Sequence, residues 1–270
     1  MKIAICQVSP TIGNLEENRL KLAAAISEAA GQGAQIVLLP ELSNTGYSFT
    51  DKNELDKYAE SPEGQTLTSW IQLAKRFSIG IVGGFAEKGE NGNVYNSAAV
   101  VDSSGLRVVY RKAHLWGNEK LYFTPGDGQA PIVDLQGCLV GLMVCYDIEF
   151  PEWVRSVCLR GAELICCPVN LPLFTRPEGA SPSEIVRYQA QAAFNRVFIA
   201  TADRARPDRS QEWLGASVVI DPDGFVISKV DLGNEFVQVI DIDPHESRNK
   251  KIGETNDVFK DRRVDLYETK

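Results

Sequence analysis

The chain has 270 residues, of which 44% are hydrophobic and 24% are charged, and its formal net charge is −8. This is the composition of a globular protein, and the acidic balance argues against binding to nucleic acid or to an anionic membrane surface. No apolar run is long enough to span a bilayer, and no secretory leader pattern opens the sequence.

The six cysteines indicate the redox environment. None belongs to a Cys-x-x-Cys pair, and five of the six lie in strongly apolar stretches. The adjacent residues Cys166 and Cys167 would point to opposite faces of a strand. A disulfide framework or a zinc site is therefore not expected, and we predict reduced thiols, a cytoplasmic location and no metal.

The beginning of the chain has the pattern of strand, helix and strand. Residues 2–8 are nearly all apolar and β-rich, as in a strand that is buried on both faces. Asn14 is placed to cap a helix that ends at Gly31 and Gly33. Residues 35–39 form a second apolar, β-rich run, so this region predicts a βαβ unit with parallel strands.

The later elements mix helices with hairpins. The pattern predicts helices at 66–77, 151–160 and 184–195, a hairpin turn at Asn91-Gly92, a polar aromatic loop at 112–128, and strands at 79–85, 95–102, 106–111, 138–144, 164–169, 197–202, 217–220, 225–229 and 236–242. Strands alternate with helices at both ends of the chain, which indicates an α/β fold with two sheets and helices outside. We expect one domain over residues 1–270, with a polar C-terminal arm at 256–270.

Three polar residues follow predicted buried strands, namely Glu41, Lys112 and Cys145. In α/β sheets the carboxyl ends of strands border the ligand crevice. Taken singly, each residue has an ordinary explanation, as a capping carboxylate, a solvated lysine or a core cysteine. Cys145 differs from the other cysteines because it lies between an apolar strand and the helix opened by Pro151, where a nucleophile becomes exposed.

The three residue types together form a set for nucleophilic catalysis. A thiol reacts as the thiolate, and a nearby carboxylate can take its proton and later give it to a leaving amine. A lysine ammonium can stabilise the thiolate and then the tetrahedral oxyanion, and its charge lowers the cost of burying a carboxylate. This chemistry is therefore possible only if the fold brings Glu41, Lys112 and Cys145 into one pocket.

Three segments, each containing one of these residues, form a recognisable sequence pattern in the order LLPEL at 38–42, YRKAHL at 110–115 and GLMVCYD at 141–147. Four further segments belong to the same pattern: FTPG at 123–126, FPE at 150–152, RGA at 160–162 and RVDLY at 263–267. Over almost its whole length the chain resembles the amidase-like branch of the nitrilase superfamily of carbon–nitrogen hydrolases.

The resemblance implies a four-layer α-β-β-α sandwich with two mixed sheets, which pairs through its outer helices into a homodimer or a higher homo-oligomer. It implies that Glu41 is the general base, Lys112 the cation beside the oxyanion, and Cys145 the nucleophile. Glu119 matches the second glutamate of the family, which positions the substrate and assists proton transfer. The backbone N–H of Tyr146 would be the other oxyanion donor.

We expect a small linear, aliphatic amide as the partner, cleaved to a carboxylic acid and ammonia through a cysteine thioester without a cofactor. Tyr47, Trp116, Asn170 and Leu171 are expected to contact it. Within the class, the alternatives are an N-carbamoyl amidohydrolase and a nitrilase, the latter disfavoured because Tyr-Asp follows Cys145 where that branch has Trp-Glu. Outside it, the alternatives are a catalytically silent binding or scaffold protein and a glutaminase module that supplies ammonia to a synthetase.

Other polar residues have competing interpretations. His114 and His245 are the only histidines in the sequence, so a Cys–His hydrolase would have to use one of them. For His114 we expect a structural hydrogen bond in its loop instead. Arginines at 204, 206 and 209 could meet an anionic substrate, although a solvated loop is the favoured interpretation; Arg176 could bind a carboxylate but by default is a surface residue.

Overall fold

The computed structural model describes residues 1–90 and 92–267. The elements in chain order are β1 (Lys2–Gln7), α1 (Leu15–Gly31), β2 (Ile36–Leu38), α2 (Lys52–Tyr58), α3 (Gln65–Phe77), β3 (Gly80–Lys88), β4 (Val94–Asp102), β5 (Gly105–Arg111), α4 (Glu119–Tyr122), β6 (Ile132–Leu135), β7 (Cys138–Leu142), the 3₁₀ helix η1 (Cys145–Glu149), α5 (Pro151–Leu159), β8 (Leu164–Pro168), α6 (Ser183–Asn195), β9 (Phe198–Ala202), β10 (Val218–Ile220), β11 (Phe236–Asp241) and the 3₁₀ helix η2 (Pro244–Arg248). None of the helices within the described ranges is long and apolar enough to cross a membrane.

The strands form two mixed sheets in the described part of the chain. The first has the order β11-β1-β2-β3-β4-β5, and the second has the order β10-β9-β8-β7-β6. β1, β2 and β3 are parallel to one another, as are β7, β8 and β9, while the outer strands pair antiparallel. The parallel strands are buried on both faces, which is why they read as continuous apolar runs in the sequence.

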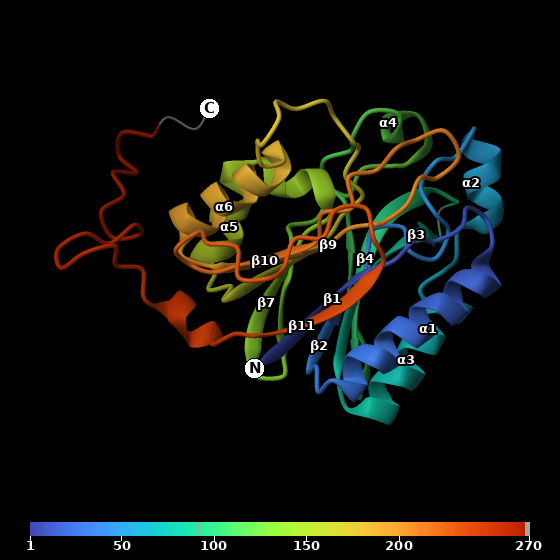
Figure 1. Cartoon of the computed structure of the whole chain (residues 1–270), viewed down its shortest axis with the longest axis horizontal. Coiled ribbons are helices and arrows are strands. Elements are labelled where there is room, and N and C mark those ends of the chain that lie inside the picture. Colours follow the sequence, from blue (N-terminus) through green and yellow to red (C-terminus); the bar gives the residue numbers. More distant parts are fainter. Residues whose placement is uncertain (91, 268–270) are drawn as a thin grey trace.

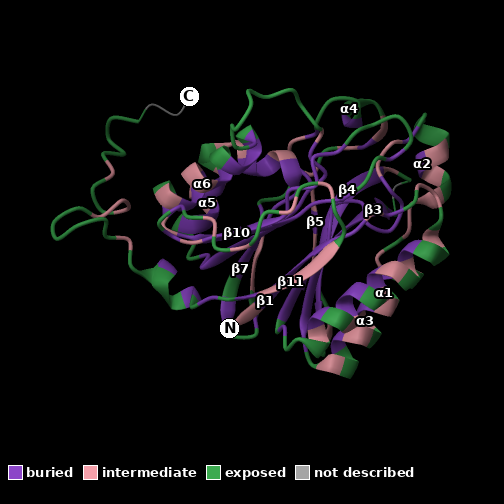
Figure 2. Ribbon diagram, in the orientation of Figure 1, coloured by how far each residue is buried: buried purple, intermediate pink, exposed green. Residues whose placement is uncertain are grey.

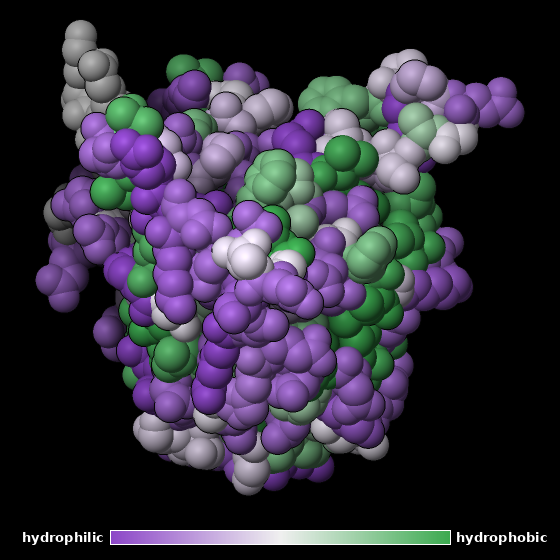
Figure 3. Space-filling model, turned by 90° about the vertical axis from the view of Figure 1, so that its left-hand side faces the viewer, coloured by the Kyte–Doolittle hydropathy of each residue, from purple (hydrophilic) through white to green (hydrophobic). Residues whose placement is uncertain are grey.

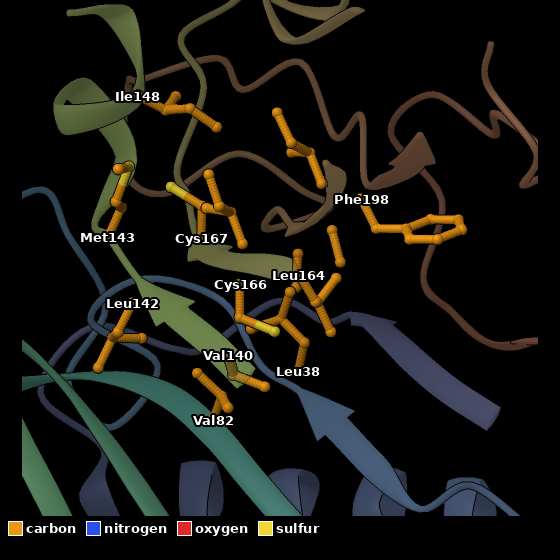
Figure 4. Packing of buried hydrophobic residues seen from close by; sticks show 14 of the residues in the cluster. Leu38, Val82, Val140, Leu142, Met143, Ile148, Leu164, Cys166, Cys167 and Phe198 are labelled. Carbon is orange, nitrogen blue, oxygen red and sulfur yellow. The ribbon is translucent and has the colours of Figure 1, made fainter. Parts of the chain in front are cut away.

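The two sheets pack face to face with helices outside them. Figure 1 shows α1 and α3 along the outer face of the first sheet, and α5 and α6 along the outer face of the second. Between the sheets, Leu38 and Val82 of the first face Val140 and Cys166 of the second (Figure 4), and the strands between the helical layers are buried (Figure 2). The predicted four-layer α-β-β-α sandwich is thereby confirmed.

The first and last strands of the chain pair with each other in the first sheet. β1 pairs with β2 on one side and with the last strand, β11, on the other. After η2 the chain extends away from the body as an arm (Figure 1). The pairing of the first and last strands supports our proposal of a single domain, whereas the arm was expected to begin at residue 256 and the chain leaves the body soon after η2.

Local signals explain most of the helix boundaries. The Asn14 side chain accepts a hydrogen bond from the Glu17 backbone N–H at 3.4 Å, as the predicted N-cap of α1. Pro151 occupies the first turn of α5, as expected for a helix opened by proline. Two short helices were not predicted, because α2 buries only Leu55 and α4 is a single turn inside the expected loop at 112–128.

The sequence pattern was wrong at two other places. Strand β6 was not predicted, and the predicted strand at 225–229 is absent from the described residues, where Val226 makes only an isolated bridge to Ile220. The side chain of Phe225 is exposed, so the apolar residues there do not mark a buried strand. The predicted turn at Asn91-Gly92 joins β3 to β4, which pair antiparallel, but Asn91 lies outside the described residues.

Candidate active site

Three strand ends supply the residues predicted to be catalytic. Glu41 follows β2 and Lys112 follows β5 in the first sheet, whereas Cys145 follows β7 in the second. β2 and β5 run in the same direction, so their carboxyl ends lie at one edge of their sheet. Face-to-face packing of the sheets then brings the end of β7 to that edge.

Lys112 lies between two buried carboxylates. Its Nζ donates to Glu41 Oε1 at 2.8 Å and to Glu119 Oε1 at 2.9 Å, and all three side chains are almost completely inaccessible to solvent. Burial favours the neutral amine, but the charges of Glu119 and Glu41 outweigh it and raise the pKa of Lys112 well above its ordinary value. The site therefore contains a fixed cation beside two carboxylates.

Glu41 has one oxygen engaged and one free of protein partners. Oε1 accepts hydrogen bonds from Lys112 and from Asn96 Nδ2, the latter at 2.7 Å. Oε2 is buried and has no hydrogen-bond partner among the described residues. Burial raises the pKa of Glu41 to about 7, although the charge of Lys112 opposes this. Such a carboxyl can accept and return a proton near neutral pH.

Cys145 lies at a strained turn between β7 and η1. Its φ of 47° is in the left-handed region that side chains rarely adopt, which is typical of a nucleophile held at a sharp strand-to-helix turn. Sγ donates to the backbone carbonyl of Asn170 at 3.8 Å. Burial and the charge of Glu41 raise the pKa of Cys145 well above its ordinary value, against the opposing charge of Lys112. The resting group is thus a thiol that needs a base, rather than a preformed thiolate.

The backbone of Glu41 packs closely against strand β3. A Cβ atom at Gly84 of β3 would lie 2.5 Å from the Cα of Glu41, so no larger residue fits there without moving the chain. Leu42, the next residue, has a φ of 47°, a second strained position at the same edge. The position of the carboxylate is therefore fixed by close backbone packing against β3.

Glu119 is fixed from three sides. It begins α4, and its Oε2 accepts the Trp116 backbone N–H at 2.9 Å. Its Oε1 accepts hydrogen bonds from Lys112 and from the Tyr47 hydroxyl. Tyr47 is held in turn by its backbone N–H, which donates to Asp208 Oδ2 at 2.9 Å. Glu119 thus has a well-defined position beside Lys112.

A cavity of about 270 Å³ opens at the thiol. Cys145 and Tyr146 line it together with three of the four residues expected to contact substrate, Trp116, Asn170 and Leu171. The fourth, Tyr47, lines a neighbouring cavity of about 470 Å³, which Trp116 also borders. The first cavity is at the small end of the range for ligand sites, so it suits a small substrate.

His114 lies in a different network. Its Nδ1 is 2.7 Å from Asp147 Oδ1, and its ring stacks on Phe150 with centroids 3.9 Å apart. Asp147 also accepts a hydrogen bond from the Tyr110 hydroxyl at 2.8 Å. The predicted structural hydrogen bond of His114 is confirmed, and Asp147, two residues after Cys145, joins β5 to the turn at Cys145.

The sequence interpretation of Arg204 was wrong. Its side chain is 1% exposed and pairs with Asp208 at 3.0 Å, so it lies in neither a solvated loop nor the cavity at Cys145. One further polar residue was missed, Asn96, whose Nδ2 donates to Glu41 Oε1. Asn170 was expected to contact substrate, and its Nδ2 donates to the Glu41 backbone carbonyl at 2.9 Å. Asn96 could have been noticed, because it is an amide within an otherwise apolar strand.

Comparisons with known proteins show the family of the chain. A model of the carbon-nitrogen hydrolase family matches residues 2–251. A protein of Pyrococcus abyssi named nitrilase is 40% identical over 269 residues, 99% of each chain. A 2-oxoglutaramate amidase of Bacillus subtilis is 32% identical and covers 98% of each chain. The structure of a variant of the amidase from Nesterenkonia sp. AN1, with acrylamide added at its active site cysteine, aligns with a TM-score of 0.80, 26% identity and 98% of each chain.

Proposed function

Because the chain belongs to the carbon–nitrogen hydrolase family, and so acts on non-peptide carbon–nitrogen bonds, we propose that it hydrolyses a small linear, aliphatic amide to a carboxylic acid and ammonia. The observation that supports this most directly is the placement of Lys112 Nζ against both Glu41 and Glu119, at the strand ends that border Cys145. A catalytically silent scaffold would have no reason to bury three charged groups around a thiol.

The first half of the reaction forms a thioester. Glu41 takes the proton from Cys145 as Sγ bonds to the carbonyl carbon, and the π electrons move to the carbonyl oxygen. Lys112 and the backbone N–H of Tyr146 stabilise the oxyanion. The tetrahedral intermediate then collapses, the carbon–nitrogen bond breaks, and Glu41 returns its proton to the nitrogen, which leaves as ammonia.

The second half releases the acid. A water molecule gives a proton to Glu41 and attacks the thioester carbon, and the second tetrahedral intermediate expels Cys145, which regains the proton. Glu119 keeps Lys112 in place through both halves, since it shares that ammonium with Glu41. Both halves use one base and one oxyanion site, so no cofactor is required by this scheme.

The pH dependence should report the titration of Glu41. The carboxylate form accepts the thiol proton, so kcat/KM should fall about tenfold per pH unit below a midpoint near 7, where Glu41 becomes protonated. Glu41→Gln should lose activity at every pH, and His114→Asn should keep the midpoint. A midpoint that disappears in His114→Asn would instead indicate a Cys–His mechanism.

An amide and its matching nitrile should separate the two main substrate classes. The Pyrococcus abyssi relative is named nitrilase, which makes a nitrile the second candidate. An amide already carries the oxygen that Lys112 would bind, whereas a nitrile forms a thioimidate and needs an added water to reach the acid. We expect butanamide to release ammonia, and to transfer its acyl group to hydroxylamine, with a higher kcat/KM than butanenitrile.

The outcomes of this assay are distinct. A higher kcat/KM for butanenitrile would rule out the amidase assignment while leaving the thiol chemistry of Cys145 possible. An N-carbamoyl compound, tested in parallel, would release carbon dioxide together with ammonia, and preference for it would favour that branch. Ammonia that appears only with a co-purifying synthetase would indicate a glutaminase module.

We also propose a homodimer formed through α5 and α6. These helices carry exposed apolar side chains, among them Phe194, which is 63% exposed. Seen from the side of the arm, hydrophobic residues form separate patches among hydrophilic ones (Figure 3). Light scattering should give the mass of a dimer for the wild type and of a monomer for Phe194→Glu, while Leu20→Glu on α1, also at an exposed position, should remain dimeric. A monomeric wild type would contradict the proposal.

A further inference from the structure

The cavity at Cys145 contains more negative than positive charge, apart from the Glu41–Lys112–Glu119 cluster. Its charged lining residues are Glu149, Glu184 and Arg187. Glu149 is at the end of η1, the 3₁₀ helix that starts at Cys145, and Glu184 is in the first turn of α6 with only 6% of its surface exposed. Carboxylates are rarely buried in this way unless a cation pairs with them.

Arg187 is the cation that faces these two carboxylates, and both already engage it. Its Nε pairs with Glu149 Oε2, and its Nη2 lies 3.3 Å from Glu184 Oε1. One guanidinium therefore balances two carboxylates, which leaves one negative charge in excess. Arg176, considered from the sequence for a substrate carboxylate, lines a separate surface cavity with Thr175 and Glu178.

An amide oxygen adds a second, independent feature. Asn170 is among the residues that line the same cavity, and it is 3% exposed. Its Nδ2 donates to the Glu41 backbone carbonyl, which fixes the orientation of the amide. Its Oδ1 is buried and has no hydrogen-bond partner among the described residues. A buried acceptor without a partner is costly, and a ligand N–H would satisfy it.

The charge of Glu149 is incompletely compensated. Burial raises the pKa of Glu149 above its ordinary value, even though Arg187 acts in the opposite direction. A second cation in the cavity would favour the ionised form of Glu149 and would be attracted by its negative charge. A carboxylate placed there would instead meet two like charges in a site that is partly shielded from water.

We propose that this cavity recognises a protonated amine on the acyl part of the substrate, so that the preferred substrates are small amino amides. The proposal rests on the proposed function, since it names the substrate class of the same site. The excess carboxylate at Glu149 and Glu184 attracts the ammonium, and Asn170 Oδ1 accepts a substrate N–H. The same charges exclude amides that carry a free carboxylate.

Three amides of the same length test the proposal on the intact enzyme: 3-aminopropanamide, butanamide and succinamate, which end in an ammonium, a methyl and a carboxylate. We expect kcat/KM to decrease in that order by about tenfold per step, the effect of about 1.4 kcal/mol of screened charge interaction. The steps should shrink as salt is added. A preference for succinamate, or no preference among the three, would overturn the inference while leaving the amidase intact, whereas failure to hydrolyse any of the three would count against the proposed function itself.

Two variants locate the effect within the cavity. Glu149→Gln and Glu184→Gln remove one negative charge each and should lower the ratio of kcat/KM for 3-aminopropanamide over butanamide by about tenfold. Glu152→Gln, an exposed glutamate in the first turn of α5 outside the cavity lining, is the matched control and should keep the ratio. If both cavity variants keep the wild-type ratio, the ammonium is recognised elsewhere and the proposal is wrong.

Discussion

Replacing Cys145 with alanine is expected to abolish turnover, with a loss of at least about 10⁵-fold in kcat, because no other group can form the thioester. The fold should survive. Alanine would occupy the same left-handed backbone position as Cys145, and only one sulfur atom is removed. We therefore expect a change in unfolding free energy of about 1 kcal/mol, measured by denaturant titration alongside the activity assay.

A matched control is available in the neighbouring strand. Cys167 is fully buried, and its Sγ lies 3.9 Å from the backbone carbonyl of Cys145. Cys167→Ala deletes the same atom next to the site and should retain turnover. Of the six cysteines, Cys145 lines the cavity at the strand ends, so iodoacetamide should label the peptide that contains Cys145 first. The rate of this labelling should increase as the pH rises through about 7, where Glu41 ionises. Normal turnover in Cys145→Ala would refute the mechanism.

Replacing Lys112 with methionine is expected to damage both activity and stability. As an oxyanion donor, Lys112 should account for about a hundred- to thousandfold in kcat. The variant also leaves Glu41 and Glu119 buried without their shared cation, which typically costs about 3–5 kcal/mol of folding free energy. Methionine keeps most of the volume of the lysine side chain and lacks its terminal ammonium, so the loss reports mainly the charge rather than a cavity.

The stability of this variant should depend on pH in a defined direction. Lys112 opposes the burial that raises the pKa of Glu41, so its removal raises that pKa further above the unfolded value. A raised carboxyl pKa means that folding is favoured when the group is protonated, and that stability is lost as pH rises through the folded-state pKa. Thermal unfolding of Lys112→Met should therefore improve at acidic pH relative to neutral pH.

Lys120→Met provides the comparison, since Lys120 is exposed on α4, one residue after Glu119. It should keep both kcat and stability, because exposed charges contribute little. If Lys112→Met behaves like Lys120→Met, the buried cation has no part in the reaction and the mechanism proposed for Glu41 and Cys145 would need another oxyanion donor.

The buried segments, and the polar residues that follow them, could be predicted from local sequence patterns. The parallel strands are apolar on both faces, so 35–39 and 164–169 were recognisable without any knowledge of their neighbours. The cap at Asn14 is equally local. Segments whose apolar side chains are sparse or exposed, such as α2 and 225–229, were misjudged because periodicity depends on a buried face.

The meeting of three strand ends in one site could not be predicted in this way, because it depends on how the strands and sheets pack. Glu41 and Lys112 follow strands β2 and β5, which are separated by β3 and β4, and Cys145 follows a strand of the other sheet. An apolar pattern shows that a strand is buried but not against which partner it packs. The resting thiol of Cys145 and the raised pKa of Glu41 likewise follow from burial and from charges close in space. Those distances are set by strand order within the first sheet and by packing between the two sheets; Glu41 and Lys112, for example, are 71 positions apart in the chain, and no local pattern encodes their contact.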